Sequence, residues 1–159
     1  MSFALRLFIL VGLPGYLQRR LQAVLNAAAR LVFRLRCYDH IGLTDALAIL
    51  HWLRLPERVN FKLALMAYRV LHGLAPEYLN QLVLVSDLPA RRRLRSSSTL
   101  QLLIPPYRLS TIGRRSFPVA ASVFWNALPP DVQSSPSVSI FRQRLKSYLF
   151  HLSFPDVII

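Results

Sequence analysis

The sequence predicts a mainly α-helical protein of about five or six helices, with one small β-hairpin in an arginine-rich arm. Apolar residues recur at three- and four-residue steps through most of the chain, as on the buried face of a helix. Proline and glycine stand where these periodic segments end, and the alternation typical of a strand is confined to one stretch. With 159 residues, of which 53% are hydrophobic and 17% charged, the chain can bury a core and is too apolar to be disordered throughout.

Residues 16–36 are predicted to form the first long helix. We expect this helix to pack through one apolar stripe, formed by Leu17, Leu21, Val24, Ala28, Leu31 and Leu35. The preceding residues 1–13 are apolar apart from Ser2, Arg6 and Gly12, and they predict a short buried or interfacial helix. Thr44 and Asp45 predict the N-cap and first turn of a second, short helix that ends near Trp52.

The third helix is predicted to span residues 56–72, from a proline suited to a first turn to Gly73, which suits the left-handed position after a helix. Its apolar residues form two stripes, so we expect burial on more than one side. One stripe comprises Val59, Leu63, Met66, Ala67 and Val70, and the other comprises Phe61, Leu65 and Tyr68. Pro76 predicts a further turn that reaches Leu82.

Residues 86–116, which we call the arginine arm, differ in composition from the rest of the chain. They hold seven arginines and a single acidic residue, and runs of serine and proline mark loops. Leu100, Leu102 and Ile104 stand at alternate positions, like one face of a half-buried strand. Residues 107–112 are predicted to pair with them and complete the hairpin.

Two further helices are predicted after the arm. Pro118 begins the first, which Pro129 ends, and Ser137 caps the last. The buried face of the last helix is expected to comprise Phe141, Leu145, Tyr148 and Leu149. The chain thus divides into an apolar segment (1–13), a helical subdomain (14–85), the arm (86–116), the carboxy-terminal helices (117–150) and a tail (151–159).

The net charge of +13, from 20 basic and 7 acidic residues, predicts an acidic partner. Eighteen of the basic residues are arginine, whose planar fork suits phosphate, although a GC-rich coding sequence also enriches arginine. The first apolar stretch is interrupted at Pro14, well before the ~20 residues that a spanning helix needs, so no membrane span is expected. It is also followed by no small-residue cleavage site, which favours the nucleus or the cytoplasm over secretion.

No local arrangement of residues predicts an enzyme. The seven carboxylates lie at least six positions apart, so no neighbouring pair could hold divalent cations. Cys37 and His40 have a metal-like spacing, but a single cysteine favours a buried thiol over a zinc site. The Walker, G-x-S-x-G and G-x-G-x-x-G motifs are absent. We therefore expect no catalytic residues, no metal and no cofactor.

Within the arginine arm, four guanidinium groups fall within five residues. In an extended segment they could follow a nucleic-acid backbone and release its counterions, and a nearby tyrosine could stack on a base. The candidate nucleic-acid-binding residues are Arg91, Arg92, Arg93, Arg95, Tyr107, Arg108, Arg114 and Arg115. A solvated loop, a patch for anionic membranes and a nuclear-import signal are alternative interpretations.

A series of short segments along residues 13–150 resembles a known family. The segments are residues 21–31, 51–56, 61–62, 71–79, 94–97, 115–117, 125–129 and 141–146. Each is weak alone, but their order resembles the carboxy-terminal tail of the reverse-transcriptase polyprotein of LINE-type, non-LTR retrotransposons. One departure is Arg114, which replaces an acidic residue in the family's turn before the helix at Pro118.

The resemblance implies a non-catalytic remnant that binds RNA or DNA nonspecifically. The family's endonuclease and polymerase lie upstream of this tail, and the polymerase's Tyr-x-Asp-Asp carboxylates have no counterpart here. Two alternatives stay open: a structural segment that docks on a reverse-transcriptase core or self-associates, and a decayed fragment without a selected function. Trp52 and Trp125 are expected in the core, and Asn126 is expected to cap a helix end.

Overall fold

The computed structural model describes residues 11–36, 43–87, 100–109 and 111–155. Across these residues the protein is mainly helical, as the sequence predicts. The α-helices are α2 (Gly15–Val32), α3 (Leu43–Ile49), α4 (Leu55–Leu71), α5 (Phe117–Asn126), α6 (Pro130–Gln133) and α7 (Val138–Ser153). Three short 3₁₀ helices are η1 (Glu77–Leu79), η2 (Val85–Asp87) and η4 (Gly113–Arg115).

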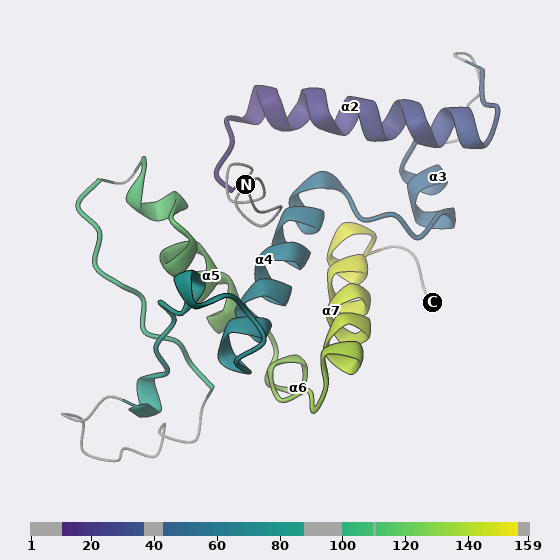
Figure 1. Cartoon of the computed structure of the whole chain (residues 1–159). Helices are drawn as coiled ribbons and strands as arrows, with labels where there is room; N and C mark the ends of the chain where they lie inside the picture. Colours follow the sequence, from purple (N-terminus) through teal and green to yellow (C-terminus); the bar gives the residue numbers. More distant parts are fainter. Residues whose placement is uncertain (1–10, 37–42, 88–99, 110, 156–159) are drawn as a thin grey trace.

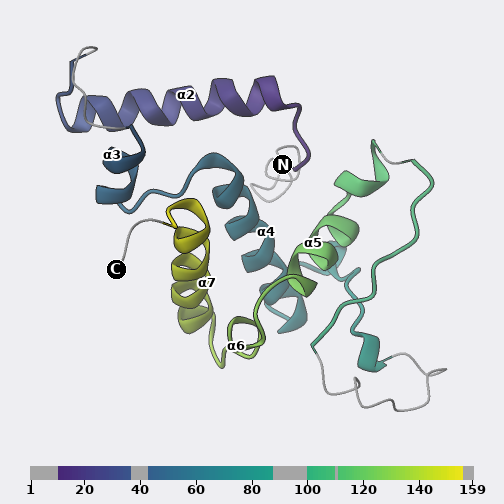
Figure 2. The same ribbon diagram turned by 180° about the vertical axis from the view of Figure 1, so that it is seen from behind.

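Helix α4 lies at the centre of the molecule and contacts α2, α5 and α7 (Figure 1). The sequence predicted burial on more than one side of this helix, and Leu63, Ala67 and Tyr68 are all buried. Helix α2 also contacts α3 and lies across one end of the arrangement, as the opposite view shows (Figure 2). Buried residues from both sides of the arginine arm form one hydrophobic cluster.

An aromatic stack links three helices at the centre of this core. The Tyr68 ring of α4 stacks on Phe141 of α7 with 4.4 Å between centroids, and Phe141 stacks on Trp125 of α5 at 5.8 Å. The Tyr68 hydroxyl donates a hydrogen bond to the Ser135 carbonyl oxygen at 2.9 Å, which satisfies its polar end inside the core. Trp125 is therefore a core residue, as expected.

Two predicted helix ends are confirmed by their hydrogen bonds. The Ser137 hydroxyl accepts a hydrogen bond from the Ile140 backbone N–H at 3.3 Å and caps the start of α7. Gly73 follows α4 with a φ of 66°, and the next N–H, of Leu74, donates to the Arg69 carbonyl at 2.7 Å. Glycine adopts this left-handed conformation at little cost, so it is favoured at this turn.

The predicted buried stripe of α2 is wrong. Leu21, Val24 and Leu31 are exposed, whereas Ala29, on another side of the helix, is fully buried. On the inner side, the Gln22 Oε1 atom accepts a hydrogen bond from the Leu55 backbone N–H at 2.8 Å. Two residues therefore define the inner face of α2. The small side chain of Ala29 lets neighbouring helices approach, and the Gln22 amide satisfies a free N–H in the first turn of α4.

The predicted hairpin between residues 100–104 and 107–112 is not present among the described residues. Leu102 instead forms an isolated antiparallel bridge with Leu84. On its other edge, the backbone N–H and C=O of Leu102 bond to the Asn126 side chain at 2.8 and 2.9 Å. The side chain of Asn126 therefore occupies the positions that a second strand would need, and it binds this segment instead of capping α5 as predicted.

Candidate nucleic-acid interface

Only part of the predicted interface can be located in the structure. Arg91, Arg92, Arg93 and Arg95 lie outside the described residues, as do Cys37 and His40. Tyr107, Arg108 and Arg114 are exposed, and Arg115 is half-buried. The structure thus leaves three of the predicted contact residues accessible to a nucleic acid.

Tyr107 packs tightly against η4. A Cβ atom on Gly113 would lie 2.5 Å from the Tyr107 Cβ, so only glycine fits at this position. The contact holds Tyr107 next to the short helix that carries Arg114 and Arg115. The Arg115 Nε atom donates a hydrogen bond to the Val11 carbonyl oxygen at 2.9 Å, so this arginine also ties the arm to the segment before α2.

A cavity of about 710 Å³ opens beside η4, and Arg114 and Arg115 are its only charged lining residues. Most of its wall is apolar and comes from the segment before α2, from α4 and from α5, with Val11, Leu63 and Phe124 among the lining residues. Two cations at one edge of an apolar wall can hold a single anionic group. They do not form the row of cations that a nucleic-acid backbone requires.

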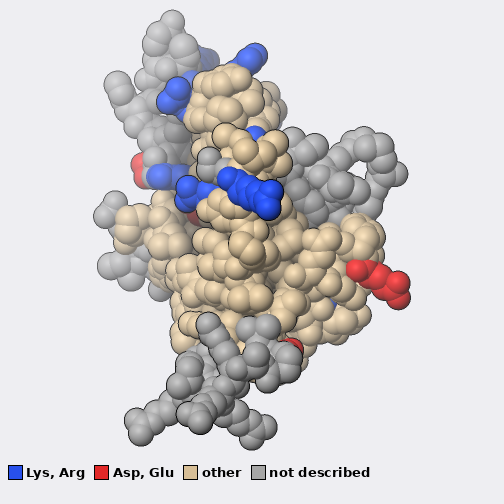
Figure 3. Space-filling view, turned by 90° about the vertical axis from the view of Figure 1, so that its left-hand side faces the viewer, with Lys and Arg blue, Asp and Glu red and all other residues tan. Residues whose placement is uncertain are grey.

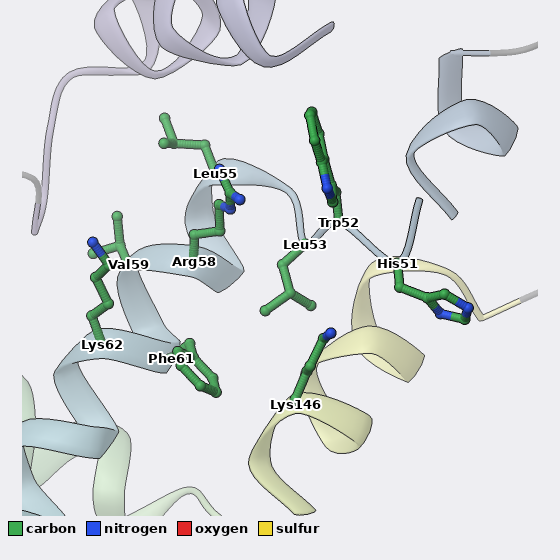
Figure 4. A pocket seen from close by; sticks show the side chains of 9 residues that line it. All are labelled: His51, Trp52, Leu53, Leu55, Arg58, Val59, Phe61, Lys62 and Lys146. Carbon is green, nitrogen blue, oxygen red and sulfur yellow. The ribbon is translucent and has the colours of Figure 1, made fainter. Parts of the chain in front are cut away.

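A second cavity, which the sequence analysis missed, combines cations and aromatic rings. It has a volume of about 500 Å³ and lies between α4, α7 and the segment that joins α3 to α4 (Figure 4). We call it the α4–α7 cavity. Its lining residues are His51, Trp52, Leu53, Leu55, Arg58, Val59, Phe61, Lys62 and Lys146, and none of them is acidic.

The turn after α3 places the aromatic part of this cavity. His51 adopts a φ of 51°, and the Trp52 N–H donates to the Leu47 carbonyl oxygen at 2.9 Å. This turn directs the chain so that Trp52 meets α4, where the Arg58 guanidinium carbon lies 5.8 Å from the indole centroid. The arrangement is a cation–π contact. Phe61 stands three positions after Arg58 and so shares its side of the helix.

The cations of the α4–α7 cavity come from two helices. Arg58 and Lys62 are one turn apart on α4, Lys146 comes from α7, and all three are exposed. Figure 4 shows Lys146 extending from α7 towards the segment that carries Leu53. On the molecular face shown in Figure 3, most of the visible Lys and Arg side chains lie in the upper half, towards α2. On this face, positive charge is therefore concentrated towards α2.

The sequence contained one local signal for this cavity, the group Arg58, Phe61 and Lys62 at helical spacing. Lys146 lies far along the chain, and only the packing of α7 against α4 brings it near. Trp52 was expected in the core, but it is half-buried and lines the cavity. The arrangement can bind phosphate oxygens through its cations and can stack a planar ring on its aromatic side chains.

No protein-family model, curated protein or solved structure matches this chain. None of the helices in the described part of the chain has the length and hydropathy that crossing a membrane requires. In the same residues, no three His, Cys, Asp or Glu side chains lie close enough together to hold a metal ion.

Proposed function

We propose that this chain binds RNA or DNA through the phosphate backbone, tolerates different base sequences and catalyses no reaction. The observation that carries the proposal is the α4–α7 cavity, whose lining includes three cations and the rings of Trp52 and Phe61 but no acidic side chain. Cations attract phosphates, and aromatic faces accept bases of any sequence. Proteins that bind single strands use this combination.

The geometry of the cavity supports contact with successive phosphates. Arg58 and Lys146 come from different helices and border the same cavity. The cation–π contact with Trp52 restricts the Arg58 side chain, which lowers the entropy lost when it binds a phosphate. Contacts of this kind read no base edge, so they confer affinity without sequence preference.

The proposal includes the origin that the sequence resemblance implies. As the tail of a LINE-type, non-LTR retrotransposon reverse transcriptase, the chain would hold template or target nucleic acid beside a polymerase encoded upstream. The arginine arm would extend the contact beyond the α4–α7 cavity. Such a role belongs to the nucleus or the cytoplasm, where these nucleic acids are found.

A salt-titrated binding experiment tests the proposal. Fluorescence anisotropy is measured with a labelled mixed-sequence RNA strand, the same sequence as DNA, and its duplex. We expect log affinity to fall against log salt by about 0.7 per neutralised phosphate for single strands and about 0.9 for the duplex. The double variant Arg58→Gln/Lys146→Gln should reduce the slope for single strands by about 1.4, because two phosphate contacts are lost.

The matched control is Arg69→Gln/Arg142→Gln. It removes the same charge from the same two helices, at exposed positions that do not line the cavity. We expect this variant to leave the slope nearly unchanged. Equal losses in the two double variants would show that net charge, and not the cavity, attracts the nucleic acid. Absence of binding, or an affinity that salt does not change, would overturn the proposal as a whole.

A further inference from the structure

Helix α2 presents an apolar stripe to solvent. Leu21, Val24, Ala28 and Leu31 are all exposed, by 67% for Val24 and 81% for Leu31. The inner side of the same 18-residue helix is occupied by α3 and α4. A row of exposed apolar side chains on one helix marks an interaction surface, because water solvates it poorly.

The spacing of this stripe suits a second helix. From Leu17 to Leu31, the apolar positions of α2 follow at steps of four, three, four and three residues, the repeat of a coiled-coil seam. Ala27 and Ala28 keep this side of α2 narrow, so another helix can approach closely. A helix that lies in a membrane surface uses bulky aromatic and leucine side chains instead, whereas the middle of this stripe is alanine.

The charges beside the stripe identify the chemistry of the partner. All charged residues of α2 are arginines, namely Arg19, Arg20 and Arg30. Arg20 stands beside the stripe, at the position before Leu21. Two copies of α2 would bring together two helices that carry only positive charge, which disfavours self-association. An acidic flank would be complementary to the same residues.

We infer that the exposed stripe of α2, formed by Leu21, Val24, Ala28 and Leu31, docks one amphipathic helix of a partner protein. The apolar residues of the partner face the stripe, and its Asp or Glu residues lie towards the arginines of α2, of which Arg20 stands beside the stripe. The docked pair is a short two-helix coiled coil in which α2 keeps its contacts with α3 and α4. The stripe shares no residue with the α4–α7 cavity, so this inference stands apart from nucleic-acid binding.

The test uses the full chain and three designed peptides of three heptads each. The first has leucine at the seam positions and glutamate at the flanking positions. The second has lysine at the flanking positions, and the third is the glutamate peptide in scrambled order. We expect the glutamate peptide to bind at least about tenfold more tightly than the other two, because only it offers both an apolar seam and complementary charge.

Variants locate the contact on α2. Val24→Ser/Leu31→Ser should weaken binding of the glutamate peptide at least about tenfold, because the variant has less apolar surface to bury in the complex. Both side chains are exposed, so the circular dichroism spectrum and the thermal midpoint should stay the same. The matched control is Val123→Ser/Leu152→Ser, which changes exposed apolar residues on α5 and α7 and should leave binding intact.

Four outcomes would overturn the inference. Equal binding of the scrambled peptide would indicate charge attraction alone, and equal binding of the lysine peptide would indicate apolar contact alone. A dimer in sedimentation that Val24→Ser/Leu31→Ser dissociates would make a second copy the occupant. Binding to phosphatidylserine vesicles that depends on the stripe, without preference for the glutamate peptide, would make a membrane the occupant.

Discussion

At the scale of single residues, three helices end in the same type of turn, with a left-handed residue after the helix. Only one of the three has glycine at that position. The left-handed residues are Arg34, His51 and Gly73, with φ values of 52°, 51° and 66°. After each, the next N–H donates to the carbonyl five positions back, at 2.9, 2.9 and 2.7 Å. This conformation costs a residue with a Cβ about 1–2 kcal/mol, so arginine and histidine are not expected there. Only the turn at Gly73 could therefore be predicted from the sequence.

The strain at His51 gives the first prediction. We expect His51→Gly to be more stable than His51→Ala by about 1 kcal/mol, because glycine relieves the left-handed strain and alanine does not. Both variants lose the contact between the imidazole and the Phe150 ring, at 5.4 Å between centroids, so that loss cancels in the comparison. Urea denaturation of the two variants measures the difference. A glycine variant less stable than the alanine variant would contradict the prediction.

Asn126 gives the second prediction, because one side chain satisfies both backbone groups of a buried residue. Asn126→Ala removes the bonds of 2.8 and 2.9 Å to Leu102 and should lower the free energy of unfolding by about 2 kcal/mol. Amide hydrogen exchange near Leu102 should become faster at the same time. Asn126→Asp keeps the acceptor, but its second carboxylate oxygen faces the Leu102 carbonyl oxygen, so its cost should be at least that of the alanine variant. An alanine variant as stable as the original chain would show that the two bonds do not hold this segment.

At the scale of elements, the sequence predicted where helices lie better than it predicted which of their faces are buried. The ends at Gly73 and Ser137 depend on local hydrogen bonds, so the local sequence contains them. Helix α2 has apolar residues on two sides, and only the approach of α3 and α4 decides that Ala29 is buried. The alternation around Leu102 was recognised, but its partner, Leu84, lies outside the predicted hairpin.

The candidate site follows the same division. Arg58, Phe61 and Lys62 are neighbours on one helix, so their shared side can be predicted from spacing alone. The contribution of Lys146 requires the packing of α7 against α4. Trp52 reaches the cavity because of a left-handed histidine, which no rule for helix ends would favour over glycine.

The arginine arm gives the prediction that belongs to this scale. The variant in which Arg91, Arg92, Arg93 and Arg95 are all replaced by serine should bind RNA and DNA more weakly, with the salt slope for single strands reduced by up to about 2.8. If the arm and the α4–α7 cavity contact different phosphates, the losses of this variant and of Arg58→Gln/Lys146→Gln should add.

The control for the arm removes four charges elsewhere. Replacing Arg19, Arg30, Arg69 and Arg142 with serine gives the same net charge, and all four side chains are exposed. Gel-shift and anisotropy titrations at several salt concentrations compare the two variants. An equal loss of affinity would mean that the position of the arginines does not matter and that the arm is not a specific contact.

At the scale of the whole molecule, the core joins segments that the sequence analysis had assigned to separate units. One cluster of buried residues includes Ala29 of α2, Leu63 of α4 and Phe141 of α7. Helix α4 contacts both α5 and α7, and the hydroxyl of Tyr68 is bonded to the loop before α7. Because α5 and α7 bury apolar residues against α4, we expect these three helices to unfold together in one transition.

Phe141 tests this cooperativity, because its fully buried ring touches the aromatic partners of two other helices. Phe141→Ala should lower the free energy of unfolding by about 4 kcal/mol, from lost burial and the cavity left behind. Hydrogen exchange should then show an equal loss of protection in α4, α5 and α7. Ile140→Ala, at the exposed neighbouring position, should change the free energy of unfolding by less than about 0.5 kcal/mol. If Phe141→Ala does not fold, the milder Phe141→Leu serves for the same comparison. If protection persists in α4 while α5 and α7 lose theirs, the helices before and after the arginine arm fold independently. The α4–α7 cavity would then form only when these two groups of helices dock.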